Sequence, residues 1–171
     1  GWFLASTYWV SNSLIVDVNS NWFLMPVMAL ALALTLASFW AVAGAVSFFF
    51  GLHPLARTLW LLIFFSLSEW ARGFVATGFP WNLTGSMFAV DLASMQAASF
   101  IGVYGLCVIA VVFAGAPVFW VLGHRRFSII AITMPIILAV AGVIRLAGAP
   151  VLLAPSNAEP VVRLVQPAIP Q

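Results

Sequence analysis

Long apolar segments separated by short polar ones constrain this sequence more than any other feature. Within its 171 residues, apolar stretches fall at roughly 2–16, 22–50, 55–76, 92–121 and 127–147. A helix rises about 1.5 Å per residue, so about 20 apolar residues cross the ~30 Å hydrocarbon core of a bilayer. The last four segments reach this length and the first does not. We therefore predict four full transmembrane helices preceded by a partial one.

The scarcity of charged residues supports a membrane protein. Charged residues make up 6% of the chain and apolar residues 64%, whereas about a quarter of a soluble domain is charged. The net charge of +2 is too small, and the arginines too scattered, for nucleic-acid binding. A single cysteine excludes an internal disulfide and a thiolate metal cluster. We expect an all-α polytopic membrane protein that binds no nucleic acid, metal or cofactor.

The arginines predict an orientation in the membrane. Arg57 and the neighbouring Arg125 and Arg126 lie in alternate loops between the apolar segments. Loops rich in basic residues stay on the cytoplasmic side, so the other loops and the C-terminal segment are expected to face outward. Arg145 lies near an outer helix end, where a long side chain can reach the headgroups.

Both ends of the chain suggest a fragment. Gly1 opens directly into an apolar run, and the chain stops soon after the β-branched run 161–171. That run follows a proline-containing stretch and reads as a strand entering a soluble domain. We therefore expect a partial transmembrane domain at 1–147, a linker at 148–160 on the outer side, and a truncated domain beginning at 161–171.

Glu69 and Arg72 stand at the end of an apolar run, where charge is costly. Each charge at membrane depth costs about 2.5–3.5 kcal/mol on insertion scales. Residues three apart on a helix share a face, so the two side chains can pair. In one interpretation, the ion pair is structural and fixes the helix end to its neighbour. In the other, the pair, or Arg72 alone, contacts a lipid phosphate or orders the outer loop.

The loop that follows carries two large aromatic residues in the stretch Gly78-Phe79-Pro80-Trp81-Asn82. Pro80 fixes its own φ and disfavours helix at Phe79, while Gly78 permits a tight turn. The aromatic side chains then sit at headgroup depth. They serve either as an ordinary interfacial anchor or as a wall of an entrance for lipid acyl chains.

Other distinctive residues have structural interpretations. Cys107 lies in the middle of an apolar segment and reads as a small core residue. Asp17 and Asp91 lie at the ends of apolar segments, and both read as helix caps. Alanines recur every fourth position at Ala37, Ala41 and Ala45, a spacing that lets membrane helices approach closely.

Several motifs, in order, resemble one known family. They are EWARG at 69–73, TGFPWN at 77–82 and VQPAIPQ at 165–171, together with the opening run 1–17 and the helix-like run IGVYGLCVIAVVFA at 101–114. This set is similar to the apolipoprotein N-acyltransferases of Gram-negative bacteria, and the resemblance covers the whole chain.

The resemblance implies a monomeric, multi-pass enzyme of the bacterial inner membrane, with about eight helices and a nitrilase-like α/β domain in the periplasm. Such an enzyme moves an acyl chain from a phospholipid through a cysteine thioester to the amine of the diacylglyceryl-cysteine of an apolipoprotein. A Glu-Lys-Cys triad in the nitrilase-like domain performs the transfer. Glu69 and Cys107 do not match the triad, so no catalytic residue is expected in this chain, which would be inactive alone.

Within this resemblance, the candidate lipid-path residues are those of the charge pair and the loop: Glu69, Arg72, Phe79, Pro80, Trp81 and Asn82. The alternative is a self-contained helical transporter or assembly scaffold without catalysis. Transporters place ionisable residues and broken helices near the bilayer midplane. Here the charges cluster at predicted helix ends and Pro135 is the clear mid-helix breaker, which favours the acyltransferase.

Overall fold

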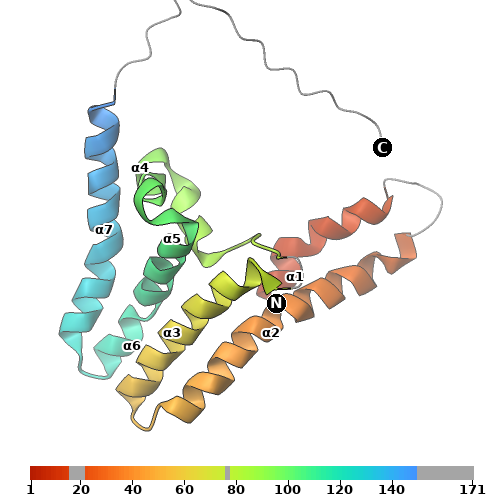
Figure 1. Ribbon diagram of the computed structural model, residues 1–171, viewed down its shortest axis with the longest axis horizontal. Coiled ribbons are helices and arrows are strands. Elements are labelled where there is room, and N and C mark those ends of the chain that lie inside the picture. Colours follow the sequence, from red (N-terminus) through yellow and green to blue (C-terminus); the bar gives the residue numbers. More distant parts are fainter. Residues whose placement is uncertain (16–21, 76–77, 150–171) are drawn as a thin grey trace, which may run out of the picture.

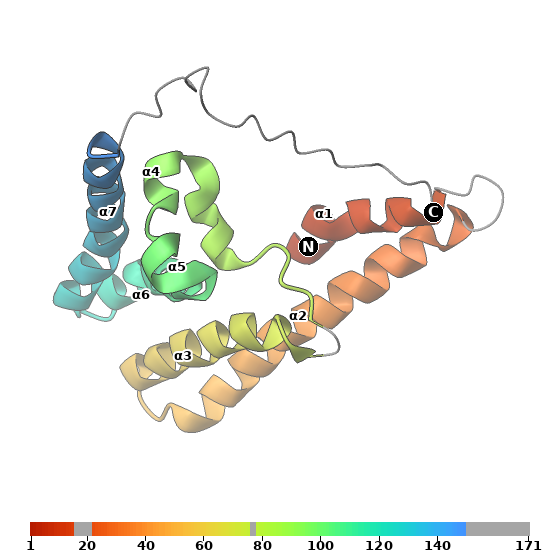
Figure 2. The same cartoon turned by 45° about the horizontal axis from the view of Figure 1, so that its top comes forward.

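The computed structural model describes residues 1–15, 22–75 and 78–149, and every regular element in these ranges is a helix. Figures 1 and 2 show two groups of helices, one formed by α1 to α3 and the other by α4 to α7. The loop that follows α3 connects them. The predicted all-α class is confirmed. The predicted strand at 161–171 and the linker from residue 150 onward lie outside the described residues.

The first group begins with α1 (Trp2–Thr7), which continues as the 3-10 helix η1 (Tyr8–Ile15) and packs along α2. The short 3-10 helix η2 (Trp22–Leu24) leads into α2 (Met25–Phe50). A proline in the first turn of α2 suits a position where no backbone N–H is required. The hydroxyl of Thr7 donates to the carbonyl of Phe3 at 2.6 Å, so this buried polar group is satisfied within its own helix.

Helix α3 (Pro54–Arg72) runs back along α2 after a tight turn. Arg57 stabilises this turn, because its guanidinium donates to the carbonyl of Gly51 at 3.3 Å. The same group lies 4.2 Å from the centre of the Phe48 ring. The turn therefore has a cation and an aromatic ring at the end of two long apolar helices.

The second group contains the 3-10 helix η4 (Thr84–Val90) and the short helix α4 (Leu92–Met95). Three further helices follow: α5 (Ala98–Ala114), α6 (Ala116–Val121) and α7 (Arg125–Ala147). Helix η4 packs against α5, and α7 packs against α4, α5 and α6. Figure 1 shows α7 at the outer edge of this group.

Asp91 is the N-cap of α4, as predicted. One of its carboxylate oxygens accepts the backbone N–H groups of Ala93 and Ser94 at 2.8 and 2.9 Å. The other accepts the Ser94 hydroxyl at 2.7 Å. The hydrogen bonds from Ser94 hold the pKa of Asp91 below its ordinary value. The second predicted cap, Asp17, lies outside the described residues.

Three helical segments in the described part of the chain are long and apolar enough to cross a membrane: Trp22–Phe50, Ala98–Val121 and Arg125–Ala147. Helix α3, which matches the expected span 55–76, has 19 residues but is not among them. Its hydropathy is lower because Arg57, Glu69 and Arg72 lie within it. The expected span 92–121 is divided into α4, α5 and α6, and Gly102 interrupts the helical backbone with φ +66°.

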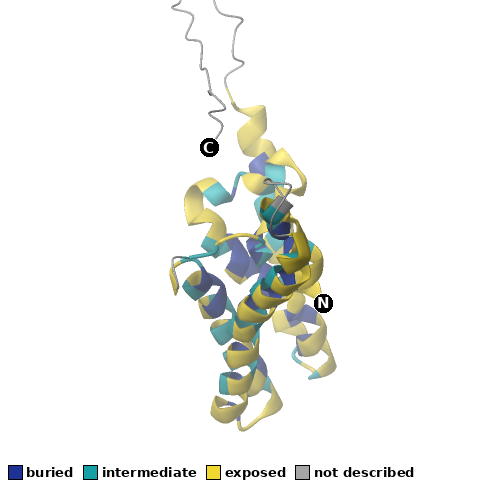
Figure 3. Ribbon diagram, turned by 90° about the vertical axis from the view of Figure 1, so that its right-hand side faces the viewer, coloured by how far each residue is buried: buried dark blue, intermediate teal, exposed yellow. Residues whose placement is uncertain are grey.

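Buried residues are concentrated where the helices meet (Figure 3). Many large apolar side chains are exposed on the outside. One buried cluster, formed by Phe88, Ala97, Leu106, Ile109 and Ala110, joins η4 to α5. A second, formed by Phe3, Ala33 and Leu36, joins α1 to α2. Outward-facing residues such as Phe49 and Val121 are more than four-fifths exposed, as expected of a surface that contacts lipid.

Of the packing stripe predicted on α2, only Ala37 packs against a buried cluster of the described residues. Ala41 and Ala45 are exposed and Ala37 is only half-buried. The buried residues of α2 are Ala29, Ala33, Leu36, Ala43 and Ser47. The helix is apolar on all sides, so the spacing of its alanines did not identify the face that packs.

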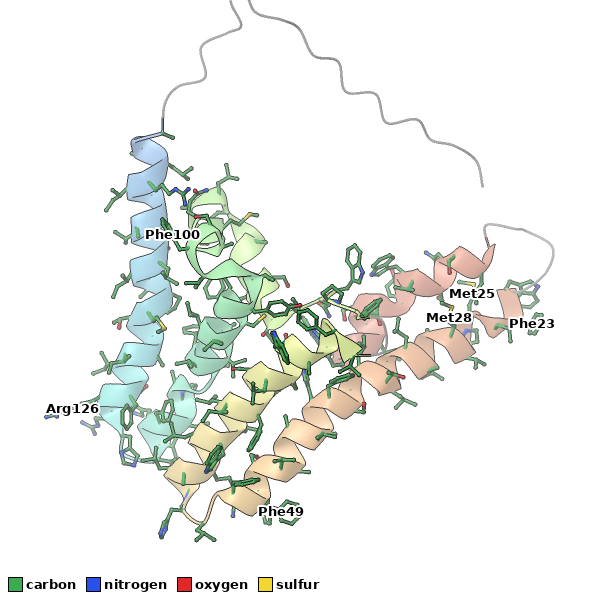
Figure 4. The ribbon with its side chains drawn as sticks, viewed as in Figure 1. Phe23, Met25, Met28, Phe49, Phe100 and Arg126 are labelled. Carbon is green, nitrogen blue, oxygen red and sulfur yellow. The ribbon has the colours of Figure 1, made fainter. Side chains whose placement is uncertain are left out.

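The basic residues of the two predicted cytoplasmic loops lie at the same end of the molecule. The α2–α3 turn, where Gly51 accepts a hydrogen bond from Arg57, and the α6–α7 turn are both at the lower end in Figure 1. Figure 4 shows Arg126 and Phe49 near this end, whereas Phe100 lies toward the opposite end. Loops that lie on the same side of a membrane must be at the same end of the helices, and the two basic turns are.

Candidate functional site

The predicted ion pair forms at the C-terminal end of α3. A guanidinium nitrogen of Arg72, Nη2, lies 3.3 Å from Oε1 of Glu69. The side chains are 1% and 0% exposed, respectively. The two residues are one helical turn apart, so α3 itself brings them together. Both are surrounded by protein rather than by solvent or lipid.

The carboxylate of Glu69 connects three parts of the chain. Its Oε1 accepts the indole N–H of Trp40, from α2, at 2.9 Å. Its Oε2 accepts the backbone N–H of Thr84 at 2.7 Å and the Thr84 hydroxyl at 3.1 Å. These neutral donors and Arg72 together engage both oxygens. The carboxylate therefore joins α2, α3 and the start of η4.

Arg72 connects α3 to the loop and to α1. Its Nη2 donates to the carbonyl oxygen of Asn82 at 3.3 Å, and its Cζ lies 5.0 Å from the centre of the Phe3 ring. A guanidinium carries five N–H donors. Among the described residues, its Nε and Nη1 have no hydrogen-bond partner although both atoms are buried.

Backbone geometry fixes the loop against α3. The N–H of Phe79 donates to the carbonyl of Arg72 at 2.8 Å. Gly78 has φ +82°, and a side chain there would lie 2.2 Å from the carbonyl oxygen of Gly73, so the turn requires glycine. Asn82 also has positive φ, at 56°, a conformation that asparagine tolerates better than most residues.

The loop is also joined to α1 through Asn82, whose side-chain amide donates to the hydroxyl of Ser6. Phe79 is half-buried and packs against the cluster of Phe3 and Leu36. Trp81, in contrast, is 58% exposed and meets Trp9 edge to face, with ring centres 5.9 Å apart. The loop is therefore attached to α3 and to α1, and it carries the exposed indole of Trp81.

The six predicted site residues lie in one region but not in one cluster. Glu69, Arg72 and Asn82 are connected by direct contacts. Phe79 joins them through its backbone. Pro80 and Trp81 occupy the exposed part of the loop.

Sequence reasoning missed three partners: Trp40, Thr84 and Phe3. A tryptophan within a long apolar helix needs an acceptor for its N–H, and Glu69 is the nearby acid in α3. That requirement was the available signal for Trp40. Thr84 and Phe3 had no comparable signal, because their contacts depend on how the loop and α1 fold back.

Glu69 and Arg72 form a buried pair in which the negative charge of one side chain balances the positive charge of the other. Glu69 has no exposed surface, so it does not act as a base toward a group in solvent. No group of three or more metal-binding side chains occurs within residues 1–15, 22–75 and 78–149. Cys107 is 1% exposed and accepts the N–H of Gly85 at 3.3 Å, which confirms its packing role.

Comparison with known sequences identifies relatives along the whole chain. The family described as the apolipoprotein N-acyltransferase N-terminal domain matches residues 1–116, which include the EWARG and TGFPWN motifs. No solved structure matches this chain.

Three relatives illustrate the similarity. The apolipoprotein N-acyltransferase of Brucella suis biovar 1 (strain 1330) is 35% identical over 175 residues, covering 100% of this chain and 32% of that protein. The protein of the same name from Caulobacter vibrioides is 37% identical over 122 residues, covering 70% and 23%. The one from Rhodopseudomonas palustris is 32% identical over 177 residues, covering 100% and 32%. The chain thus spans about a third of the length of the first and third relatives.

Proposed function

Because the chain belongs to the apolipoprotein N-acyltransferase family, we propose that it forms the membrane part of an enzyme that acylates apolipoproteins. The full-length protein would take a fatty acyl chain from a phospholipid and transfer it to the amine of an N-terminal diacylglyceryl-cysteine. The family membership and the membrane-length helices support this proposal. The reaction is assigned to the full-length protein, and the present chain is expected to be inactive alone.

The role proposed for this membrane part is to hold the catalytic domain at the bilayer surface and to line the path by which lipid reaches it. The observation that carries this role is the loop after α3. Its backbone is fixed by Arg72 and by the Asn82–Ser6 contact, yet Trp81 is 58% exposed. A rigid loop with an exposed aromatic at a helix end is suited to guide an acyl chain along a defined surface.

We place this loop on the periplasmic side of the bacterial inner membrane. Arg57 lies in the first turn of α3, at the opposite end of that helix from the loop, and Arg125 and Arg126 begin α7. The positive-inside rule assigns these basic helix starts to the cytoplasm. With this orientation, the segment after α7 leads toward the periplasm. A nitrilase-like domain that continues from 161–171 would then lie on the same side of the membrane as the loop.

Replacing Trp81 by alanine in the full-length protein tests the proposed lipid path. We expect the rate of acyl transfer from phospholipid to fall about tenfold, equivalent to ~1.4 kcal/mol of lost stabilisation. The measurement is transfer of a labelled acyl chain to a diacylglyceryl peptide in detergent micelles, at matched protein amounts. Absence of any transfer by the unaltered full-length protein would refute the enzyme assignment itself.

A matched control is Trp22→Ala. Trp22 is also exposed, at 68%, and among the residues that the structure describes it meets Phe23 edge to face, with ring centres 6.5 Å apart. This change removes an indole of the same kind from the start of the long helix and should leave the rate unchanged. Equal rates for the Trp81 variant and the unaltered enzyme would reduce the loop to an interfacial anchor.

A further inference from the structure

An apolar groove lies in the second helix group, next to the α6–α7 turn. The end of α5, the helix α6 and the start of α7 form its walls, and its volume is about 640 Å³. Cavities that bind small molecules in proteins have volumes of roughly 300–1,000 Å³. The residues that line this α6–α7 groove include Phe113, Trp120, Val121 and Ile132.

The α6–α7 groove lies at a depth that acyl chains occupy. Both segments that form it, Ala98–Val121 and Arg125–Ala147, are long and apolar enough to cross a membrane. On α7 the lining extends to Ile132, seven residues after Arg125, or about 10 Å at 1.5 Å per residue. One leaflet of the hydrocarbon core is about half of ~30 Å. The groove therefore runs from the helix end well into one leaflet.

The walls of the groove suit an apolar chain. Ser128 belongs to the lining, but it is 2% exposed and its hydroxyl donates to the carbonyl of Ala116 at 2.8 Å. This hydroxyl is therefore satisfied within the protein. Trp120 and Val121, in contrast, are 52% and 84% exposed, so large apolar surfaces remain available to an occupant.

A cation lies beside the groove. The Cζ of Arg125 is 5.2 Å from the centre of the Trp120 ring, which lines the groove. Arg125 and the adjacent Arg126 are both exposed. Figure 4 shows Arg126 at the start of α7, near the lower end of the molecule. The end of the groove at the turn is therefore positively charged.

The described part of the chain supplies no counter-charge here. It contains two acidic residues: Glu69, which forms the one ion pair of this part, and Asp91, which caps α4. The other two, Asp17 and Glu159, lie outside the described residues. A guanidinium binds a negatively charged oxygen more strongly than a neutral one. A positive charge beside an apolar groove is therefore complementary to an anionic amphiphile.

We propose that the α6–α7 groove binds an anionic glycerophospholipid, such as phosphatidylglycerol, with its phosphodiester contacting Arg125 and one acyl chain lying in the groove. In the orientation proposed above, this lipid belongs to the cytoplasmic leaflet, whose anionic lipids attract basic residues near the membrane surface. The α6–α7 turn lies at the end of the molecule where α3 begins, away from the loop that follows α3 (Figure 1). The bound lipid is therefore distinct from the acyl donor, and the inference goes beyond the proposed function.

Removing the charge of Arg125 tests the headgroup contact. In the full-length protein, Arg125→Gln should weaken binding of phosphatidylglycerol about fivefold, because one basic residue near an anionic lipid surface contributes a factor of this size. The measurement is a lipid titration followed by native mass spectrometry.

The matched control is Arg145→Gln. Arg145 is also exposed and lies 4.9 Å from an aromatic ring, that of Phe100, but it is at the opposite end of α7. This variant should bind phosphatidylglycerol normally. Equal weakening in both variants would show a general attraction between charges and would overturn the site.

Filling the groove tests the acyl-chain contact independently. Ile132 lines the groove and is 42% exposed, so a larger side chain can extend into the groove without displacing a buried residue. Ile132→Trp should weaken phosphatidylglycerol binding at least as much as Arg125→Gln. The control is Ile130→Trp, because Ile130 is 56% exposed on the same helix and outside the lining. Equal affinities in the two tryptophan variants would overturn the placement of the chain.

Comparison of ligands identifies what the site recognises. Phosphatidylethanolamine has the same phosphodiester but carries a compensating ammonium group, so its binding should depend less on Arg125 than that of phosphatidylglycerol. Inorganic phosphate has no chain and should not displace phosphatidylglycerol at millimolar concentration. Equal dependence of the two lipids on Arg125 would overturn the preference for an anionic lipid. Displacement by phosphate would show a free-anion site instead.

Native mass spectrometry also detects the alternative occupant, a second copy of the chain. A dimer that is lost in Ile132→Trp and kept in Ile130→Trp would show that a second copy covers the groove, which would overturn the lipid site. Phosphatidylglycerol affinity that is identical in Arg125→Gln, Ile132→Trp and the unaltered protein would overturn it even if acyl transfer proceeds. Binding that depends on Arg125 and on Ile132 in a protein without acyl transfer would support the site and refute only the proposed enzyme function.

Discussion

Two arginines in the last turns of long helices, Arg72 in α3 and Arg145 in α7, occupy contrasting environments. Arg72 is 1% exposed and pairs with a carboxylate, a loop carbonyl and an aromatic ring. Arg145 is exposed, donates to the hydroxyl of Ser99, and lies 4.9 Å from the Phe100 ring. The same residue type at equivalent helix positions thus lies in a buried network in one case and on the surface in the other.

The contrast shows that different interactions join each helix end to its neighbours. At the end of α3, ionic and hydrogen-bonding contacts join α2, the loop and η4. At the end of α7 the hydrogen bonds of Arg145 are exposed, and the buried contact is close backbone packing. Gly142 lies so near α4 that a Cβ there would come within 1.9 Å of the Ala93 carbonyl oxygen. Charge should therefore determine stability at the first end, and residue volume at the second.

Glu69→Ala should have the largest effect. It leaves Arg72 as a buried, uncompensated cation and removes the acceptor of Trp40 and Thr84. Breaking a buried pair by removing one partner costs about 3–5 kcal/mol. The check is the thermal unfolding midpoint of the full-length protein in detergent, which should fall by several degrees. Glu69→Gln keeps an acceptor oxygen and should lose less, and a midpoint unchanged by both variants would mean that the cluster is hydrated rather than buried.

The sequence predicted this pair correctly because its two members are one turn apart on a single helix. The pairing is confirmed at 3.3 Å. The partners Trp40 and Thr84 are separated from Glu69 by 29 and 15 positions. Their contacts depend on how α2 is rotated and on how the loop returns to α3, and no local pattern records either. The functional role of the six candidate residues remains a prediction.

Gly142→Ala should have an intermediate effect at the other helix end. The added methyl group would meet the backbone of Ala93 at 1.9 Å, so α7 must shift away from α4 at a cost of about 1–3 kcal/mol. Gly44→Ala is the matched control, because it adds the same group within α2 where nothing lies within 4 Å. The control should be neutral or raise the unfolding midpoint, since alanine favours a helix over glycine by about 1 kcal/mol. Equal losses in both variants would contradict close packing at Gly142.

Packing faces were the part of the fold that the sequence could not define. The stripe predicted at Ala37, Ala41 and Ala45 is largely exposed, while Ala33 and Ala43 are buried. In a soluble helix the polar face identifies the buried face by contrast. Since α2 is apolar all round, that contrast is absent. The break at Gly102 was equally hidden, because glycine is frequent in membrane helices.

Arg145→Ala should have the smallest effect on the unfolding midpoint, although Arg145, like Arg72, is an arginine in the last turn of a long helix. Its contacts with Ser99 and with the carbonyl of Gln96, at 3.4 Å, are exposed. The stacking over Phe100 is also at the surface, where a cation–π contact contributes about 0.5–1 kcal/mol. We expect an unfolding midpoint within a few degrees of the unaltered protein. Arg145→Lys, which retains the cation, should be closer still. A loss as large as that of Glu69→Ala would mean that Arg145 is held in a buried network, and the contrast between the two helix ends would no longer hold.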